Sequence, residues 1–520
     1  MTDPKTPAAP QTPPVVEGGS LEEQIALKKA KVAEMRARGV DPYPARSVRV
    51  QTAAQSLALG AELTDKPGTD KVVTAGRLVE LRDMGKSIFG RLADQSGRVQ
   101  VYFKKDALPE AQFAMIKKDL YVGDYIGVEG VMFKTRTGEV TVAASGVTML
   151  SKALRPMPEK WHGLKDVETR YRHRHLDLMS NPDVLNAFLK RSKIISTIRR
   201  VMDGQGYVEV ETPILLTQAG GASARPFETH HNALDADMVM RIATELYLKR
   251  LVIGGFDKVY EIGRIFRNEG IDTRHNPEFT MMECYAAYSD YEQMAELFES
   301  IVGECSEALK IDEIDFAGKK INLKPPFKRE YLPELWKKYC GGEPIENVLA
   351  GKGFNRAALL ALANKLGVHA GEKTPSAKVF DRIFDARIIE HLEQMTFVFD
   401  HPTAITPLAK LKGGAGEGIV ERFEAFAVGQ EFSNAYSELN DPEDQRDRLK
   451  EQSRARKEEG DDEADILDED FVQAMESGMP PMGGMGVGID RLVMLLTGQP
   501  SIRDVILFPT LKPHDSQEPS

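Results

Sequence analysis

The stretch VYEIGRIFRNEGIDTRHNPEFTMMECY, residues 259–285, decides the fold of this chain. Two strand-like runs flank a polar loop, residues 268–277, which is too charged and too broken to be a strand. Because side chains alternate between the two faces of a strand, Arg267 closes one face of the first run. The second run has one face that carries Phe279, Glu283 and Tyr285. Antiparallel pairing of the runs is predicted to gather an arginine, an aromatic ring, a carboxylate and a phenol around one cleft.

The chemistry of these side chains favours a nucleotide site. The planar guanidinium of Arg267 suits a phosphate or carboxylate, and Phe279 offers a face to a flat heterocycle. Arg274 and His275 in the loop are placed to reach further anionic oxygens. The alternative is a surface hairpin with solvated charges, which would have to explain the many ionisable residues of this one hairpin: Glu261, Arg264, Arg267, Glu269, Arg274, His275, Glu278 and Glu283.

Length and composition set limits on the rest of the chain. The 520 residues suffice for two or three domains, and the formal charge of −11 means that a nucleic acid would have to meet local basic patches. The three cysteines have no paired spacing, which suits a reducing cytoplasm. No apolar run approaches the ~20 residues that cross a bilayer, so no membrane partner is expected. Residues 1–19 are predicted to be a disordered tail.

Short β runs between residues 67 and 150, with a helical piece near 109–118 between the third and fourth, predict a five-stranded β-barrel of the OB type. Before it, residues 20–66 are expected to form an amphipathic helix and a connector. The helix carries lysines and arginines on its polar face, which is either simply solvated or a ridge that lies on nucleic-acid phosphates.

Three segments carry a family resemblance. FRNEG followed by RHNPEFTMMECY is similar to motif 2 of the class II aminoacyl-tRNA synthetases, and most similar to that of the lysyl-tRNA synthetases. GQGYVEVETPILL (204–216) resembles motif 1, and MGGMGVGIDRLVMLLTG (482–498), which we expect to be a glycine-rich turn opening a helix, resembles motif 3. The resemblance runs from about residue 20 to 512, and the barrel segment is similar to the family's anticodon-binding domain.

The resemblance implies an α+β catalytic domain with an antiparallel sheet flanked by helices. It would occupy residues 183–512, with an inserted helical region at about 304–396, a linker at 151–182 before it and a loose tail at 513–520. Motif 1 around Pro213 would build a homodimer interface.

The resemblance also implies residue roles in ATP binding. Arg267 would clamp the α-phosphate and the amino-acid carboxylate, Glu269 would accept the adenine amino group, and Phe279 would stack on adenine. His275 would lie near the outer phosphates, and Arg491 would cover the other adenine face. Glu424 and Glu431 flank a chain reversal and would hold Mg²⁺, of which up to three ions are expected. Arg267 and Arg491 are the predicted catalytic pair.

The matching positions for lysine are Gly221, Glu245, Arg267, Glu283, Tyr285, Asn434 and Glu438. A desolvated ε-ammonium demands counter-charge, which Glu245 and Glu438 with Tyr285 would supply, while Glu283 would take the α-ammonium. In the barrel, Phe89 would stack on the central anticodon base, and Arg82, Gln100 and Glu139 would contact base edges.

The expected function is therefore ATP-dependent ligation of L-lysine to tRNA(Lys) through a lysyl-adenylate, with release of pyrophosphate and AMP. Two alternatives stay open: a lysine ligase that modifies a protein, and a non-catalytic paralogue that binds nucleic acid. The first would be expected to lack the barrel, and the second to have lost Arg267, Glu424, Glu431 or Arg491.

Overall fold

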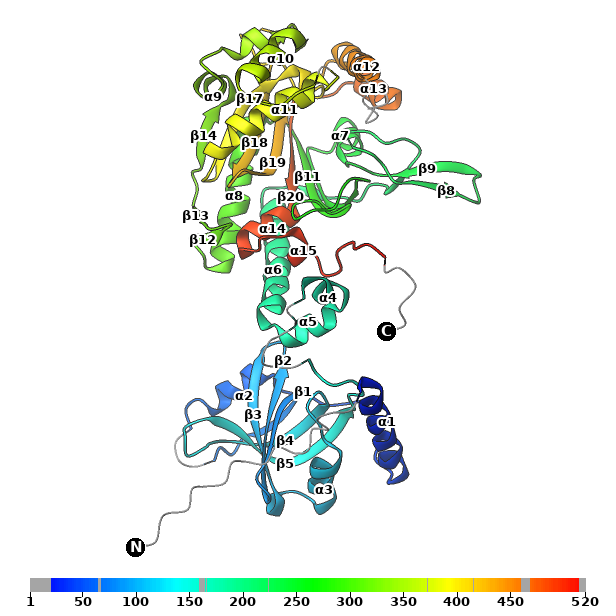
Figure 1. Ribbon diagram of the computed structural model, residues 1–520, viewed down its shortest axis with the longest axis vertical. Coiled ribbons are helices and arrows are strands. Elements are labelled where there is room, and N and C mark those ends of the chain that lie inside the picture. The colour runs from blue at the N-terminus through cyan, green and yellow to red at the C-terminus, as the bar shows by residue number, and fades with distance from the viewer. Residues whose placement is uncertain are drawn as a thin grey trace. The chain divides into compact units, whose positions relative to one another are not determined.

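The computed structural model describes residues 20–63, 67–158, 164, 166–222, 224–371, 373–414, 416–459 and 468–513. The predicted tails at 1–19 and, beyond residue 513, at the C-terminus lie outside these residues. The chain divides into two units, residues 1–165 and 166–520. Figure 1 shows the β-barrel of the first and the large sheet of the second.

The first unit contains the predicted barrel. Its strands close in the order β1-β2-β3-β5-β4, and α3 (Glu110–Asp119) lies between the third and the fourth, as the sequence predicted. In β2, Ile88 and Leu92 point into the core while Phe89 and Arg91 stay half-buried on the outer face. The strands are β1 (Lys71–Asp83), β2 (Ser87–Asp94), β3 (Gly97–Lys104), β4 (Tyr125–Lys134) and β5 (Val140–Ser151).

Two helices, α1 (Leu21–Ala37) and α2 (Ala53–Gly60), precede the barrel. A capping box between Ser20 and Glu23 begins α1. Part of the predicted basic ridge faces protein rather than solvent, because Lys31 and Arg38 pair with the buried Asp119, Arg38 at 2.7 Å. Only the remaining basic side chains of α1 are candidates for phosphate contacts.

The second unit is built on one eight-stranded sheet, which is antiparallel except for its two edge pairs (Figure 1). The outer pairs β14–β17 and β10–β6 are parallel. The predicted antiparallel α+β architecture is thus confirmed, with a mixed pattern at the edges. In order across the sheet the strands are β14 (Lys328–Tyr331), β17 (Thr396–Pro402), β18 (Ile419–Ala427), β19 (Gln430–Ser437), β20 (Met482–Gly488), β11 (Glu278–Ala287), β10 (Lys258–Phe266) and β6 (Val208–Glu209).

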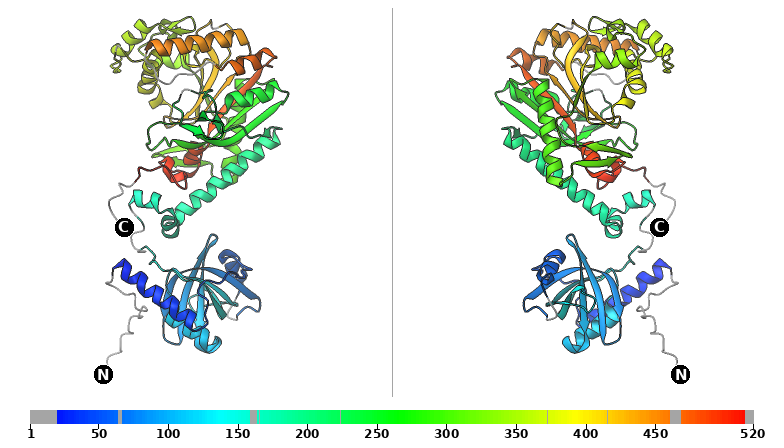
Figure 2. Two further views of the ribbon diagram at one scale, coloured as in Figure 1. Left: turned by 90° about the vertical axis from the view of Figure 1, so that its right-hand side faces the viewer. Right: turned by 90° about the vertical axis from the view of Figure 1, so that its left-hand side faces the viewer.

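Helices flank this sheet. α8 (Tyr291–Leu309) packs on β19 and β20, and α6 (Pro182–Gly204) packs on α8 (Figures 1 and 2). Buried Met294, Phe298, Ile301 and Cys305 line one face of α8 at helical spacing and enter the main core. Outside the region 304–396, the unit also contains α4 (Val167–Arg172), α5 (Arg174–Ser180), α7 (Glu245–Ile253), α12 (Pro442–Glu459), α13 (Glu469–Glu476), α14 (Ile489–Thr497) and α15 (Ile502–Val505).

The glycine-rich run 482–488 is not a turn, as the sequence had led us to expect, but the central strand β20. It pairs with β11 on one side and β19 on the other. A Cβ built on Gly484 would come within 2.0 Å of the Glu438 carboxylate and 2.4 Å of the Tyr285 ring. The run is therefore glycine because side chains from neighbouring strands lie across it.

The region 304–396 is mixed rather than wholly helical. It begins inside α8, and its strand β14 joins the main sheet. A separate core gathers around the buried Trp336 and Phe380, whose rings stack at 4.9 Å. Its other elements are β12 (Glu313–Phe316), β13 (Lys319–Asn322), α9 (Leu332–Tyr339), β15 (Leu349–Ala350), β16 (Gly353–Phe354), α10 (Arg356–Lys365) and α11 (Ser376–Arg387).

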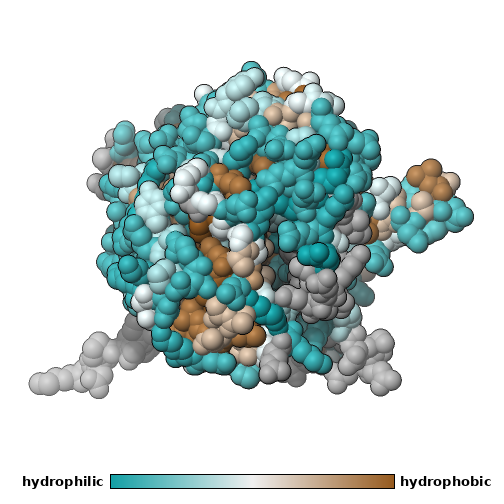
Figure 3. All heavy atoms as spheres, turned by 90° about the horizontal axis from the view of Figure 1, so that it is seen from above, coloured by the Kyte–Doolittle hydropathy of each residue, from teal (hydrophilic) through white to brown (hydrophobic). Residues whose placement is uncertain are grey.

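A three-stranded sheet, β7 (Leu215–Leu216), β9 (Ala236–Met240) and β8 (Glu228–His231), extends from the second unit as an arm (Figure 1). In Figure 3 the visible surface is mostly hydrophilic, with hydrophobic residues gathered in patches, one of them at the end of this arm. Leu234, in the turn between β8 and β9, is 68% exposed. Over the described ranges, no helix combines the length and the apolar character needed to cross a membrane.

Candidate active site

A cavity of about 510 Å³ opens over the middle strands of the large sheet. It brings together eight of the residues that the sequence predicted for ATP, lysine and metal: Gly221, Glu245, Arg267, Glu283, Tyr285, Glu424, Glu431 and Asn434. Of the others, Glu438 lies beneath the cavity floor, and Glu269, His275, Phe279 and Arg491 do not line this volume.

The predicted hairpin forms as β10 and β11, with Glu261 opposite Glu283 and Ile265 opposite Phe279. Arg267 follows β10, and its Cζ lies 5.3 Å from the Phe279 ring centroid. Burial lowers the pKa of Arg267, although Glu269 and Glu283 oppose this. Among the described residues no carboxylate forms an ion pair with Arg267, which suits this guanidinium to an incoming anion.

Two segments far apart in the sequence meet at Arg491, in the first turn of α14. Its Nη1 donates to the Glu431 carbonyl oxygen at 3.0 Å, and its Nη2 lies 3.2 Å from Nε2 of His275. His275 Nδ1 lies 2.9 Å from Asp272, which fixes the ring. The motif 2 loop, β19 and motif 3 thus converge, as expected of groups that act on one nucleotide.

Glu424 and Glu431 lie on adjacent strands, and both reach the cavity because β19 is irregular. Ala425 pairs with Ser433 but Phe426 pairs with Glu431, so Phe432 is an extra residue. Because of this bulge, Glu431 lies on the same face of the sheet as Asn434. In a regular strand, two residues three positions apart would lie on opposite faces. Arg422, which the sequence analysis did not single out, contacts Glu424 and donates to Asn434 at 3.0 Å.

The two carboxylates fit a divalent cation. Burial and the charge of Glu424 raise the pKa of Glu431, so a cation between them would relieve the repulsion. Asp381 of α11, from the inserted region, also lines the cavity, and burial and Glu424 raise its pKa to about 7. Within the described part of the chain, no cluster of three or more metal-ligating side chains is found.

Beneath the cavity floor lies a cation that was not predicted from the sequence. Lys249 is fully buried, its Nζ lies 2.5 Å from Glu245, and it also contacts Glu438. The Tyr436 hydroxyl donates to both Glu245 oxygens, at 2.8 and 2.9 Å. The signal was in the sequence: Lys249 follows Glu245 by four residues on one helix, which places the two side chains on the same face.

Glu438 has an unsatisfied carboxylate oxygen. The side chain is only 2% exposed, and neither oxygen makes a hydrogen bond of good geometry within the described residues, although Oε2 touches Lys249. Oε1 lies against Gly484, which lines the cavity. A buried carboxylate oxygen without a donor fits an ammonium that arrives with a ligand.

Glu283 is the third carboxylate here. It accepts from the Thr244 hydroxyl at 2.8 Å and from its backbone nitrogen at 3.3 Å. Burial, with the charge of Glu245, raises the pKa of Glu283 to about 7. Its strand neighbour Glu261 differs, because Arg241 balances that charge at 2.5 Å. Glu283 therefore remains available to a cationic ligand.

Gly221 forms part of the wall beside these acids. Its φ of 82° lies in the left-handed region, and a Cβ there would come within 3.3 Å of the Cβ atoms of Ala243 and Glu245. The site thus requires glycine both for conformation and for space.

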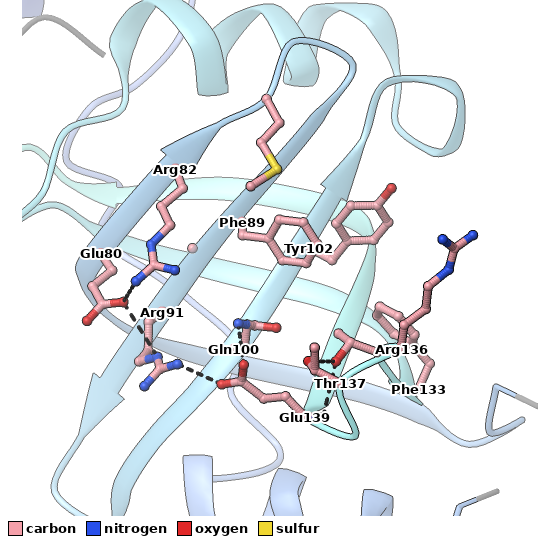
Figure 4. Close-up of a pocket in the computed structure, with 13 residues that line it drawn as sticks. Glu80, Arg82, Phe89, Arg91, Gln100, Tyr102, Phe133, Arg136, Thr137 and Glu139 are labelled. Carbon is pink, nitrogen blue, oxygen red and sulfur yellow. Dashed lines mark hydrogen bonds and ion pairs between the residues drawn. The ribbon is translucent and has the colours of Figure 1, made fainter. Parts of the chain in front are cut away.

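The barrel carries a second cavity, of about 560 Å³, lined by all four predicted anticodon residues (Figure 4). The rings of Phe89 and Tyr102 lie 4.7 Å apart, and Gln100 donates to Glu139 at 2.8 Å. Phe89 is half-buried on the outer face, so it is not part of the barrel core. Tyr102 was not predicted from the sequence, although it shares a strand face with Gln100. Glu80, Arg91, Phe133 and Arg136 are among the further lining residues that were not predicted.

Comparison with known proteins agrees with this geometry. The family of class II tRNA synthetases (D, K and N) matches residues 166–512, and the OB-fold nucleic acid binding domain matches residues 72–150. The lysine–tRNA ligase of Enterococcus faecalis is 46% identical over 497 residues, 95% of this chain and 98% of that protein. The lysine–tRNA ligase of Pelotomaculum thermopropionicum is 48% identical over 497 residues, which are 95% of this chain and 96% of that protein. The lysine–tRNA ligase of Bacillus subtilis is 46% identical over 496 residues, which are 95% of this chain and 98% of that protein. The chain therefore belongs to the class II tRNA synthetases (D, K and N), and within them to the lysine–tRNA ligase family.

Proposed function

We propose that this chain activates L-lysine with ATP and transfers it to tRNA(Lys). The observation that carries the proposal is the cavity that joins Arg267, suited to an anion, with the buried acids Glu245 and Glu283 and, beneath its floor, Glu438. An amino acid with two ammonium groups and one carboxylate complements this set. An aspartate or asparagine substrate would leave buried carboxylates unpaired, at a cost of several kcal/mol.

The amino-acid carboxylate is already ionised, so activation needs positioning and charge neutralisation more than proton transfer. A carboxylate oxygen forms a bond to the α-phosphorus as the bond to pyrophosphate breaks. Arg267 would neutralise both reacting anions, with Phe279 against the adenine ring and Glu269 accepting from its amino group. Arg491, held toward His275, would bind the outer phosphates and cover the other adenine face.

In the transfer step, a hydroxyl oxygen of the tRNA terminal ribose attacks the lysyl carbonyl carbon. The bond to AMP breaks, AMP leaves with the electron pair, and the hydroxyl proton passes to the departing phosphate or to water. No carboxylate in the cavity has to accept this proton, because an oxygen of the departing phosphate can accept it.

Glu424 and Glu431 would hold Mg²⁺, with up to three ions at turnover. When bound, Mg²⁺ neutralises phosphate charge and fixes the orientation of the polyphosphate. Arg422 keeps Glu424 in place at the cavity wall through its own contact with that carboxylate.

The barrel cavity would bind the anticodon, with Phe89 and Tyr102 as a stacking surface and Arg82, Gln100 and Glu139 at base edges. Glu139 accepts from Gln100 and from Arg91 at 2.6 Å, so an incoming base must exchange with these donors.

A homodimer through motif 1 is part of the proposal. Around Pro213 the apolar side chains Val208, Ile214 and Leu215 are 48%, 42% and 46% exposed. Covering them with a second copy would remove apolar surface from water. We also place the reaction in the cytoplasm, which suits three free, buried cysteines.

The test is ATP–pyrophosphate exchange with each of the twenty amino acids, followed by charging of tRNA(Lys). Exchange with lysine above all others, and a charged tRNA, are expected. Exchange that favours another amino acid would overturn the substrate assignment. Lysine exchange without tRNA charging, but with lysine transfer to a protein, would instead support a protein-modifying ligase.

A further inference from the structure

The floor of the proposed lysine site contains a lysine of the protein itself. Lys249 is 0% exposed, and its Nζ contacts carboxylates from two different elements, Glu245 of α7 and Glu438 just after β19. Three aromatic rings surround the ammonium at 5.5 to 5.8 Å, those of Tyr285, Tyr436 and Phe471. Burial alone would lower the pKa of Lys249, but Glu245 and Glu438 raise it. The side chain is therefore a permanent cation.

Three buried carboxyl groups lie around the single ammonium of Lys249. Glu245, Glu283 and Glu438 are each at most 5% exposed, and burial raises the pKa of both Glu283 and Glu438. With lysine bound, three carboxylates meet three ammonium groups: the substrate α- and ε-ammonium and Nζ of Lys249. Without Lys249, three carboxylates would meet only two, and at neutral pH one acid would keep a proton.

Resting on the proposed function, we infer that Lys249 is a specificity-determining positioning residue: a built-in ammonium that contacts Glu245 and Glu438 and holds both carboxylates in place for a doubly cationic amino acid. It does not line the cavity, so it acts through the two carboxylates rather than by touching substrate. Tyr436 assists by donating its hydroxyl to Glu245 from the opposite strand.

Lys249→Met tests this role in the full-length protein. We expect the lysine KM in pyrophosphate exchange to rise by about 10- to 100-fold, since one buried carboxylate loses its partner. The ATP KM and kcat should change little. Norleucine has the same carbon chain without the ε-ammonium, so the ratio of its inhibition constant to the lysine KM should fall.

A second readout does not depend on activity. Titration calorimetry of lysine binding at pH 7, in buffers of different ionisation enthalpy, counts the protons released. The variant should release more protons per lysine than the parent. Lys249 lowers the pKa of Glu438, so without Lys249 this acid holds its proton more often and must give it up when lysine binds. The titratable groups that face Nζ are Glu245, Glu438, Tyr285 and Tyr436, with Glu283 next to them.

The control is Lys152→Met. Lys152 is equally buried and pairs with Asp124 at 2.6 Å, but it belongs to the first unit. The Lys152→Met substitution should lower thermal stability while leaving the lysine KM and the number of protons released at parental values. If Lys249→Met behaves in the same way, with only stability lost, the inference is overturned and Lys249 is structural.

Lys249→Met/Glu245→Gln carries the test if the single variant does not fold. This pair again leaves two carboxylates for two ammonium groups, and Gln can still accept from Tyr436. Where both variants fold, the double variant should recover part of the lost lysine affinity. Where only the double variant folds, it should still prefer lysine to norleucine, and loss of that preference would refute the inference. Failure of the parental protein to exchange with lysine would refute the proposed function instead.

Discussion

Arg491 and His275 are 216 residues apart in the sequence, yet the Arg491 guanidinium donates to Nε2 of His275 at 3.2 Å. The same arginine donates to the Glu431 backbone at 3.0 Å. One guanidinium thus connects the loop after β10, the bulged strand β19 and helix α14. The proposed nucleotide site would therefore be assembled from three chain segments that Arg491 holds together.

The first prediction concerns this arginine. Arg491→Lys keeps the charge but loses the planar fork, so one nitrogen replaces the two, Nη1 and Nη2, that reach the Glu431 carbonyl and His275. Pyrophosphate exchange should fall by about 10²- to 10³-fold, the usual cost of losing one preorganised donor. Lysine binding measured by calorimetry should remain. Arg264→Lys is the matched control, since Arg264 pairs with Glu278 at 3.5 Å and takes no part in the contacts that Arg491 makes with Glu431 and His275. Parental exchange in Arg491→Lys would remove Arg491 from the phosphate site.

The second prediction follows from the pKa of about 7 for Glu283, which burial and Glu245 raise. Below that pH the carboxyl is neutral in the empty site, and above it is ionised and can accept the α-ammonium. The lysine KM should therefore fall as pH rises from about 6 to 8. In Glu283→Gln the KM should be high throughout and lose this dependence. A parental KM that is flat over this range would show that Glu283 does not titrate there.

The third prediction concerns Glu424 and Glu431. Either change to Gln removes one of two facing charges, so the Mg²⁺ concentration for half-maximal exchange should rise and the maximal rate should fall. The control is Glu421→Gln. Glu421 lies on β18, as Glu424 does, but does not line the cavity, so this variant should behave like the parent. Unchanged Mg²⁺ dependence in both cavity variants, with unchanged melting, would place the ion elsewhere.

The fourth prediction separates the two units. Phe89→Ala should reduce tRNA charging efficiency by about one to two decades, because stacking on an aromatic contributes ~1–3 kcal/mol per base. Exchange without tRNA and the melting temperature should stay near parental values, since Phe89 is not part of the core. The control is Tyr125→Ala, which removes a 40% exposed ring outside the barrel cavity. Full charging by a folded Phe89→Ala would exclude Phe89 from base contact.

Local pattern was sufficient for much of this protein. Alternation along β10 and β11 placed Arg267, Glu283 and Tyr285 on one face, and the structure brings all three to one cavity. The amphipathic helix before the barrel and the helix between the third and fourth barrel strands were predictable for the same reason, because each depends on residues close in sequence.

Other features were decided only by tertiary packing. The glycine-rich run 482–488 was predicted to be a turn, but it is a strand because it pairs with β11 and β19. Gly484 leaves room for the side chains of Glu438 and Tyr285 beside that strand. Glu431 reaches the cavity only through the bulge in β19, and no local signal counts that extra residue. The sequence places Lys249 on a helix, but its burial depends on residues of β11, β19 and α13 that surround its ammonium. Sequence determined which chemical groups are present and on which face of each element. Folding determined which of them lost water, and therefore which charges must be balanced by a ligand.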